Sequence, residues 1–475
     1  MLASRSKVAF LIFVANFLLA ATINGGNPTE TNFALQVGNV NFTVNGSQTF
    51  QVVDGSGVNI NVESWKGGQL RTAIDMLANP NRATLWRVIR DPIDWVKSES
   101  LIPLLHRMDR ATLQEVYEDP KMQDIWKTIA YLNEKGVTGN QIILNFMGWT
   151  PRWLGGSGRY NAESHVTAGK EHDLATMIAS LVYYGRKVKN LNFTLVAPLN
   201  EMDWNCLEGP CVSPEQYAAI VHDLISELDV MGLNNIRIVG PDTANPGNLS
   251  YIDAMMGDRS IAARVDHLSY HNYGGSLQPQ RSYPSANSWL TETAASCNDC
   301  DYAGTPAQGE WTFASQTNKA ILEDLEKGFA GVLVYDGFDS FYYHHNSYSY
   351  WGLLAYDPAS GRYRPRKRFY VNAQINAFVS PGAVRIGEDD SIDALGTTVA
   401  FYKSATNELT IIGHTEGSAV TVTGQLLGLP EFSSFAIYET NSSVDFQRGP
   451  DVPVSRAKFT LTIPADTFFS LTNKK

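Results

Sequence analysis

Residues 193–201 read Phe-Thr-Leu-Val-Ala-Pro-Leu-Asn-Glu, an apolar run that ends in two polar residues. Strands covered on both faces have such near-continuous apolar sequences, whereas half-exposed strands alternate. We therefore predict a buried strand at 193–199, with Asn200 and Glu201 just past its carboxyl end. A helix is predicted to follow at 213–230, because Ser213 is a favourable N-cap residue and Pro214 suits the first helical position.

Further short apolar runs occur between residues 51 and 378, separated by amphipathic segments. This alternation is typical of βα units, and eight such units predict a (β/α)8 TIM barrel at 51–378. An open doubly wound sheet is the alternative, but no glycine-rich phosphate turn follows the first strand. The predicted strands are 51–62, 84–89, 141–147, 193–199, 236–241, 265–270, 288–291 and 331–335. Further helices are predicted at 171–188, 317–327 and 366–378, and the basic run 364–368 is expected to be solvated.

The pattern changes after residue 378 to short alternating runs between polar turns. This is typical of an antiparallel β-sandwich, predicted at 379–475. Its strands are expected at 383–386, 397–403, 408–413, 419–423, 435–439 and 458–463. The segment 25–50 precedes the barrel and contains strand-like sequence, so we predict that it pairs with the sandwich.

Composition and the N-terminus bear on the protein's location. The 475 residues are 44% hydrophobic and 18% charged, which indicates a globular protein, and the net charge of −11 gives no basic footprint for nucleic acid, so no nucleic-acid partner is predicted. Arg5 and Lys7 precede an apolar run at 8–21, followed by small residues, the order of a signal peptide. A membrane anchor is the alternative, but the run is short for a bilayer. We predict a signal peptide at 1–24, secretion to the extracellular space, no membrane association after cleavage, and a monomer.

Four cysteines occur as two close pairs, Cys206 with Cys211 and Cys297 with Cys300. In an exported chain these predict two local disulfides. A zinc site built from both pairs is the alternative, but the spacing of the first pair argues against it, so no metal is predicted. Glycosylation sequons occur at Asn41, Asn45, Asn192, Asn248 and Asn441.

Two glutamates stand at predicted strand ends. Glu201 follows the fourth strand, and Glu292 follows the seventh. Because active sites of TIM barrels lie at the carboxyl ends of the strands, both side chains are expected on one face. Two carboxyl groups across a cleft are what glycoside hydrolysis requires. A single glutamate at such a place is usually an ordinary surface residue, but two at strands four and seven favour the functional interpretation.

With Asn200-Glu201 and Glu292 at these strands, the chain resembles the retaining clan of (β/α)8 glycoside hydrolases. It is most similar to glycoside hydrolase family 30, with family 5 next. Other positions that carry the resemblance are Arg87 with Asp94 and Trp95, His271 to Tyr273, and the passage from 364–370 to 380–386. The sequence departs from the family at Met202, where proline is usual, and at Asp336, near which clan members often have tryptophan.

The resemblance implies an O-glycosyl hydrolase that retains configuration and cleaves β-linked oligo- or polysaccharides without a cofactor. Glu201 would be the acid/base and Glu292 the nucleophile. Asn200 would bind the sugar 2-hydroxyl, Arg87 and Tyr273 would support Glu292, and His271 would line the cleft. The residues predicted to contact substrate are Asn200, Arg87, Asp94, Trp149, Trp204, His271, Tyr273 and Asp336.

Each supporting residue has a structural alternative. Asn200 could cap a loop, Arg87 could form a salt bridge inside the barrel, and His271 could be a buried, satisfied side chain. Aromatic residues after the strands predict stacking platforms for sugar rings, although core packing is the default for any one of them. They are Trp65, Trp149, Trp153, Trp204, Tyr273, Tyr342, Tyr343 and Trp351. Alternative functions are a transglycosylase that uses the same site and a non-catalytic carbohydrate-binding protein.

Overall fold

The computed structural model describes residues 38–62, 69–90, 95–147, 149–159, 162–245, 247–273, 277–279, 282–302, 304, 309–342, 345–390 and 395–474. Val37–Lys475 form one compact unit. The predicted signal peptide at 1–24 lies outside the described residues, as do Trp65, Asp94 and Tyr343. Within the described ranges, no helix is both long and apolar enough to cross a membrane.

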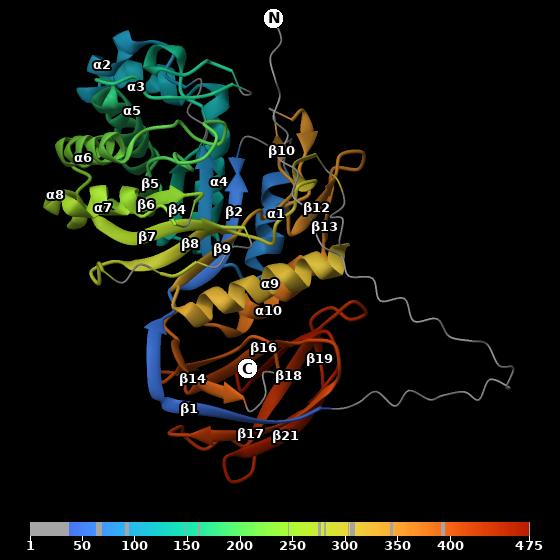
Figure 1. Ribbon diagram of the computed structural model, residues 1–475. Coiled ribbons are helices and arrows are strands. Elements are labelled where there is room, and N and C mark those ends of the chain that lie inside the picture. The colour runs from blue at the N-terminus through green and yellow to red at the C-terminus, as the bar shows by residue number, and fades with distance from the viewer. Residues whose placement is uncertain are drawn as a thin grey trace, which may run out of the picture. The chain divides into compact units, whose positions relative to one another are not determined.

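Eight parallel strands close into a barrel in chain order, which confirms the predicted TIM barrel (Figure 1). Each predicted strand overlaps one barrel strand. The first prediction, 51–62, differs most from the structure, because it covers the end of a strand that ends at Val52 and the whole of the barrel strand that begins at Gly55. The barrel strands are β2 (Gly55–Asn61), β3 (Leu85–Arg90), β4 (Gly139–Phe146), β5 (Phe193–Ala197), β6 (Arg237–Thr243), β7 (Val265–Asn272), β8 (Asn287–Thr293) and β9 (Gly331–Val334).

Side chains of each barrel strand alternate between the barrel interior and the surrounding helices. One apolar cluster fills the interior and includes Leu85, Ile143 and Trp289. Trp289 fits there because position 331 is glycine, where a Cβ atom would lie 2.7 Å from the indole ring. Two residues further along these strands, the inward positions become polar. The buried polar residues of this layer are Asn59, Arg87, Asn145 and Thr291.

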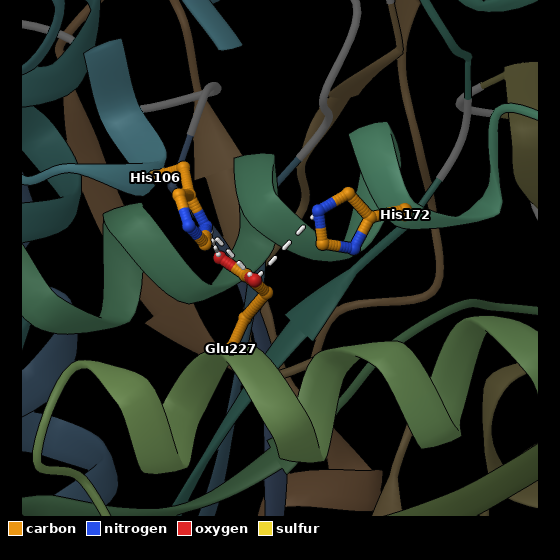
Figure 2. Close-up of side chains that lie close together, drawn as sticks. All are labelled: His106, His172 and Glu227. Carbon is orange, nitrogen blue, oxygen red and sulfur yellow. Dashed lines mark hydrogen bonds and ion pairs between the residues drawn. The ribbon is translucent and has the colours of Figure 1, made fainter. Parts of the chain in front are cut away.

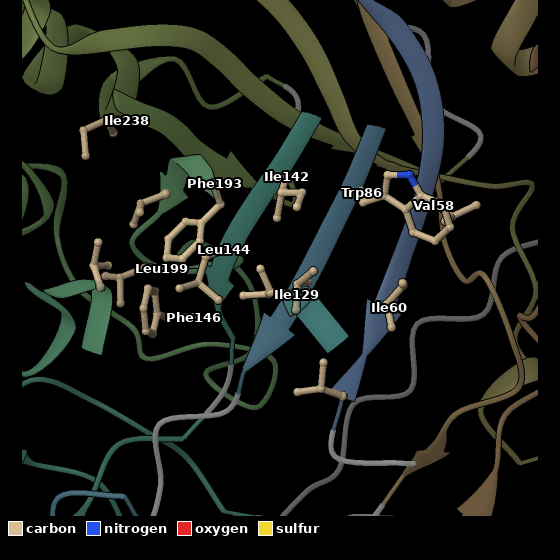
Figure 3. Packing of buried hydrophobic residues seen from close by; sticks show 14 of the residues in the cluster. Val58, Ile60, Trp86, Ile129, Ile142, Leu144, Phe146, Phe193, Leu199 and Ile238 are labelled. Atoms are coloured by element: carbon tan, nitrogen blue, oxygen red, sulfur yellow. The ribbon is translucent and has the colours of Figure 1, made fainter. Parts of the chain in front are cut away.

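Helices cover the outside of the barrel and bury apolar side chains against the strands. Ile129 packs in one cluster with strand residues such as Trp86, Ile142 and Phe146 (Figure 3). Ser213 caps its helix as predicted, accepting a hydrogen bond from the Gln216 N–H at 3.2 Å. The helices are α1 (Gln69–Ala78), α2 (Ile102–His106), α3 (Arg110–Tyr117), α4 (Gln123–Glu134), α5 (Glu171–Tyr183), α6 (Pro214–Val230), α7 (Ser250–Gly257), α8 (Arg259–Ala262), α9 (Glu310–Lys327) and α10 (Lys367–Phe378).

Helices α2 and α3 are an insertion between β3 and α4 that the sequence analysis did not predict. Helix α2 packs against α5, and α5 packs against α6. His106 of α2, His172 of α5 and Glu227 of α6 face one another where these helices meet (Figure 2).

A second domain is a ten-stranded sheet in which the N-terminal strand lies among strands from the C-terminus (Figure 1). Strand β1 (Gly38–Val52) pairs antiparallel with β14 (Val384–Asp390) and parallel with β17 (Val420–Leu427). The parallel pair differs from the predicted antiparallel pattern. It is possible because the whole barrel lies between the two strands in the chain, and parallel neighbours need a long connection.

The remaining strands of this sheet are β15 (Thr398–Lys403), β16 (Glu408–Thr415), β18 (Ser434–Thr440), β19 (Gln447–Arg448), β20 (Val452–Pro453), β21 (Lys458–Ile463) and β22 (Thr467–Thr472). Strand β22 was not predicted, although all its residues are buried and it pairs with β16 and β18. Two small hairpins follow β9, made of β10 (Phe341–Tyr342) with β11 (Ser347–Tyr348) and β12 (Leu354–Asp357) with β13 (Arg362–Pro365).

The prediction that the basic run 364–368 is solvated was wrong for two of its arginines. Arg366 is paired with the buried Asp339 at 2.6 Å. The Arg368 guanidinium is buried 4.5 Å from the centre of the Phe313 ring and donates to the Tyr350 and Trp351 carbonyls. Arg366 and Arg368 therefore neutralise and cap the loop that follows β9, whereas Arg364 is exposed.

Candidate active site

Glu201 and Glu292 meet above the polar layer of the barrel. Glu201 follows β5, the fourth barrel strand, and Glu292 lies in β8, the seventh. One carboxylate oxygen from each, together with a ring nitrogen of His271, lie within 4.8 Å of one another, and all three residues are buried. The structure therefore brings together the two carboxyl groups that the sequence placed at separate strand ends.

Arg87 is the centre of the hydrogen-bond network beneath this pair. Its Nη1 donates to Glu292 Oε1 at 2.5 Å and to Asn59 Oδ1 at 2.9 Å. Its Nη2 donates to Asn200 Oδ1 at 2.6 Å and to Asp242 Oδ2 at 2.9 Å. Burial opposes the charged form of Arg87, but the charges of Asp242 and Glu292 outweigh it and raise the pKa of the guanidinium.

Glu292 has a hydrogen-bond donor on each carboxylate oxygen. Arg87 donates to Oε1, and the Tyr273 hydroxyl donates to Oε2 at 2.5 Å. Burial, together with the nearby carboxylates, raises the pKa of Tyr273 well above its usual value, so this hydroxyl keeps its proton and remains a donor. Arg87 and Tyr273 therefore hold both carboxylate oxygens of Glu292 in place, and Arg87 sets a positive charge beside them.

Glu201 has different surroundings. Its backbone is in the left-handed region, with φ of 42°, which is uncommon for a residue with a side chain. The strand end is held there because the Glu201 N–H donates to the Asp242 carbonyl at 2.9 Å and its own carbonyl accepts from the Trp204 N–H at 3.0 Å. Burial raises the pKa of its carboxyl group, while His271 acts in the opposite direction.

His271 links the two glutamates. Its Nδ1 is 2.6 Å from Glu201 Oε1 and 3.5 Å from Glu292 Oε2. Burial favours the neutral ring, but the combined charges of Glu292, Glu201 and Asp242 raise its pKa above the ordinary value. His271, Glu201 and Glu292 have the atoms of a metal-binding set. However, the Arg87 guanidinium already supplies a positive charge to Glu292 and would repel a cation.

Asp242 was missed by the sequence analysis. It lies in β6, is fully buried, and also has a positive φ, of 57°. One carboxylate oxygen accepts from Arg87, and the other accepts from the Thr291 hydroxyl at 2.6 Å. The predicted strand 236–241 ended two residues before β6 does, so Asp242 was not recognised as a polar residue at a strand end.

The loop after β5 is fixed to the loop after β4. The Ser164 N–H donates to the Cys206 carbonyl, and the Cys211 N–H donates to the Ser164 carbonyl, both at 2.9 Å. The predicted disulfide Cys206–Cys211 is present and closes this loop. Gly209 packs directly on the residues that follow β5, where a Cβ atom would lie 1.6 Å from the Asn200 carbonyl oxygen.

The second predicted disulfide, Cys297–Cys300, is also present, in the loop after β8. The Cys300 carbonyl accepts from the Tyr350 N–H, and Asp301 accepts from the Trp351 indole at 2.7 Å. The disulfide therefore helps to fix the loop after β9 beside the site. No free cysteine is left for a metal site of the kind considered as an alternative.

No protein-family model matches the sequence, and no curated protein matches it. Solved structures do match: a glycoside hydrolase family 30 subfamily 8 xylanase from Clostridium acetobutylicum has a TM-score of 0.71 at 15% identity, covering 91% of this chain and 99% of that chain. The chain shares its fold.

Two other structures are similar over the same length. A family 30 endoxylanase from Clostridium papyrosolvens C71 has a TM-score of 0.68 at 17% identity, covering 92% of this chain and 100% of that one. An endo-β-1,6-glucanase has a TM-score of 0.64 at 17% identity, covering 92% and 94%. These likenesses establish a (β/α)8 barrel with an attached β-sandwich domain, and the function has to be argued from the residues of the site.

The structure also places the other residues that were predicted to bind substrate. Asn200 is buried, its Oδ1 accepts from Arg87, and its Nδ2 donates to the Glu208 carbonyl at 3.0 Å, so it supports the loop as well as the network. Asp336 is fully buried, and its carboxylate oxygens accept from the Gly337 N–H at 2.7 Å and the Ser340 hydroxyl. Asp336 therefore holds the loop after β9, and burial raises its pKa well above the usual value.

Most of the predicted aromatic platforms are packing residues. Tyr342 and Trp351 are buried in a cluster that reaches Tyr273, whose ring centre is 5.5 Å from that of Trp351. Trp149 is buried after β4, and Trp153 donates to the Val96 carbonyl at 2.9 Å. Large aromatic side chains gain more from burial than from solvent contact, so the default interpretation applies to them. Trp204 is the exception among these described residues, with 61% of its surface exposed.

Proposed function

We propose that this protein is a secreted retaining glycoside hydrolase that cleaves β-linked sugars by double displacement, with Glu292 as nucleophile and Glu201 as acid/base. The observation that supports it most is the pair of carboxyl groups, whose nearest oxygens lie within 4.8 Å. Retaining enzymes have their carboxyl groups about 5–5.5 Å apart, whereas inverting enzymes separate them by about 6.5–9.5 Å to admit a water molecule.

The two glutamates differ in the way that this mechanism requires. In the first step, a Glu292 oxygen attacks the anomeric carbon while Glu201 gives its proton to the departing oxygen. Arg87 and Tyr273 support the negative charge of Glu292 before the attack. Burial raises the pKa of Glu201, which keeps the acid protonated at a pH where an exposed glutamate would be ionised.

In the second step the roles of Glu201 reverse. After it has lost its proton, Glu201 accepts one from a water molecule that attacks the glycosyl-enzyme and frees Glu292. His271 Nδ1 faces the Glu201 carboxylate at 2.6 Å and therefore stabilises the ionised form that exists between the two steps. The contact with His271 lowers the pKa of Glu201, and in this second step it therefore helps Glu201 to act as the base.

The substrate class is proposed from the site and from the structural neighbours. Those neighbours are xylanases and an endo-β-1,6-glucanase, so β-xylan and β-1,6-glucan are the first polymers to test. The exposed Trp204 follows Glu201 by three residues and offers a ring for stacking on a sugar. Secretion is supported by the predicted leader at 1–24 and by the two disulfides. Among the sequon asparagines, Asn41 and Asn192 are exposed.

The test uses variants of both glutamates on activated aryl β-xylosides and β-glucosides. We expect Glu292→Ala to lose activity by roughly 10⁴-fold or more, comparable to the loss of a catalytic nucleophile elsewhere. Sodium azide should restore turnover of that variant and release a glycosyl azide of inverted configuration, because azide enters from the side that the carboxylate occupied. Glu201→Gln should lose about 10²–10⁴-fold on natural substrates.

Two results would contradict the proposal. If Glu292→Ala kept the turnover of the wild type, Glu292 would not be the nucleophile. Saturable carbohydrate binding with no turnover of any aryl glycoside or polysaccharide would favour the binding-protein alternative. Asp451→Asn is the matched control, because Asp451 is an exposed carboxylate in the sheet domain and its loss should leave activity unchanged.

A further inference from the structure

Glu227 is a buried carboxylate on the outer helical layer, away from the catalytic cluster. It lies in α6, and 3% of its side chain is exposed. Its oxygens face His106, whose Nδ1 lies 2.8 Å and 3.0 Å from them, and His172, whose Nε2 lies 3.7 Å from the nearer one (Figure 2). In the part of the chain that the structure describes, no lysine or arginine forms an ion pair with Glu227.

A buried carboxylate without a fixed positive partner is costly, because removing the charge from water is compensated only by good pairing. Lysine and arginine carry their charge permanently, but histidine is charged only when protonated. Neither histidine therefore gives Glu227 a permanent positive partner. A divalent cation bound by all three side chains would provide one.

The geometry is close to that of a zinc site. Zinc binds histidine nitrogen and carboxylate oxygen at about 2.0–2.2 Å in a tetrahedron, so neighbouring ligand atoms lie about 3.3 Å apart. The three ligand atoms here lie within 4.8 Å of one another. The separation of 3.7 Å between His172 and Glu227 is too long for a hydrogen bond but within half an ångström of that spacing.

We propose that His106, His172 and Glu227 bind one zinc ion, with water in the fourth position. The ion has a route to the site, because 42% of the His106 side chain and 54% of the His172 side chain are exposed. Two imidazoles and one carboxylate form a ligand set that zinc accepts readily. The ligands come from three helices, α2, α5 and α6, so the ion cross-links the inserted helix α2 to two helices of the barrel.

This ion has a structural role and is independent of the proposed hydrolysis. Among the described residues, none of its three ligands hydrogen-bonds or ion-pairs with Glu201, His271 or Glu292. The sequence analysis predicted no metal after weighing only the two cysteine pairs. The three ligands proposed here are 66 and 55 residues apart in the chain, and no spacing motif joins them. Only the packing of α2 on α5 and of α5 on α6 brings them together.

The experiment titrates the full-length, chelator-treated protein with zinc chloride by calorimetry and with cobalt chloride by visible absorption. We expect one zinc ion per chain, the intense visible bands of four-coordinate cobalt, and a saturable rise in Tm with zinc. His172→Ala and His106→Ala should each weaken zinc binding more than about tenfold, since even losing a side chain that only supports a ligand costs 10- to 100-fold. Both variants should also lose the rise in Tm.

His222→Ala is the matched control. His222 is a half-exposed histidine in α6 whose Nδ1 lies 3.5 Å from a carboxylate oxygen of Asp223, so its loss should leave zinc affinity unchanged. Thermal unfolding without metal checks that each variant folds. Absence of saturable zinc binding to the wild type would overturn the proposal. So would binding that survives in both His172→Ala and His106→Ala but is lost in Glu292→Gln, because the ion would then occupy the catalytic cluster.

Discussion

At the scale of single residues, the protonation of Glu201 depends on two opposing influences. Burial raises the pKa of its carboxyl group, and the contact with His271 lowers it. An acid must be protonated to act, so kcat/KM should fall as pH rises through the pKa of Glu201 in the free enzyme. Because that pKa is raised, this alkaline limb should lie above the pH at which an exposed glutamate ionises.

His271→Ala tests this assignment through the position of the limb. Removing the ring removes the hydrogen bond and charge that lower the pKa of Glu201, so the alkaline limb of kcat/KM should move to higher pH. The measurement is a pH profile on an aryl glycoside for both proteins. A limb that stays in place or moves to lower pH would show that Glu201 is not the acid or that His271 does not act on it.

Asp242 is predicted to stabilise the fold as well as the site. Asp242→Asn keeps the shape but removes a charge facing Arg87 and an acceptor facing Thr291. A hydrogen bond to a charged group contributes about 1.5–3 kcal/mol, so the free energy of unfolding should fall by about that amount. Denaturant titration measures it. Asp451→Asn, at an exposed position, should change it by less than about 0.5 kcal/mol, and an equal effect of both changes would contradict this role.

At the scale of elements, the loop after β5 determines where Asn200 and Glu201 lie. Gly209→Ala would place a Cβ atom 1.6 Å from the Asn200 carbonyl oxygen, so the loop or the strand end must move. A displacement of about 1 Å in a site costs on the order of 10²-fold in rate. We expect kcat to fall by that order while the protein remains folded, as measured by steady-state kinetics and circular dichroism.

Gly257→Ala is the control for this substitution. Nothing lies within 4 Å of a Cβ atom at Gly257, which ends α7. Its activity should equal that of the wild type. If Gly209→Ala also kept full activity, the loop would not position the acid/base in the way we describe.

The strands of the barrel were predictable because each is an apolar run with polar ends, and the alternation of strand and helix is a property of local sequence. The same reasoning located Glu201 and Glu292. It missed Asp242, because the strand was ended at Pro241, and it missed β22, whose buried residues depend on partners elsewhere in the sheet. It could not tell which of the loop aromatic residues are buried, since whether a loop tryptophan faces solvent or the core depends on loop packing that the sequence does not reveal.

At the scale of the whole molecule, the sheet domain is tied to the barrel by hydrogen bonds between side chains. Gln374 of α10 donates to the Tyr438 carbonyl at 3.1 Å and accepts from Thr440, and Trp311 of α9 donates to Asp466 at 2.7 Å. Strand β1 belongs to the sheet domain, and the chain passes directly from it into β2, the first strand of the barrel. The predicted boundary between barrel and sandwich at residue 379 therefore remains a prediction about architecture. It does not imply that either part is stable without the other.

This arrangement predicts cooperative unfolding. Because the sheet covers buried residues of α10 and includes the strand before the barrel, losing one part should expose apolar surface of the other. Calorimetry should show a single thermal transition for the whole chain. Two well-separated transitions would show that the barrel and the sheet fold independently.

The central claim is that Glu292 forms a covalent bond to the sugar. The most direct measurement uses a 2-deoxy-2-fluoro glycoside with a good leaving group, which slows release of the glycosyl-enzyme, followed by mass spectrometry of the intact protein and its peptides. We predict one added sugar per chain, attached to Glu292 and absent in Glu292→Gln. Attachment to another residue, or turnover of the reagent with an inverted product and no labelled enzyme, would contradict the account.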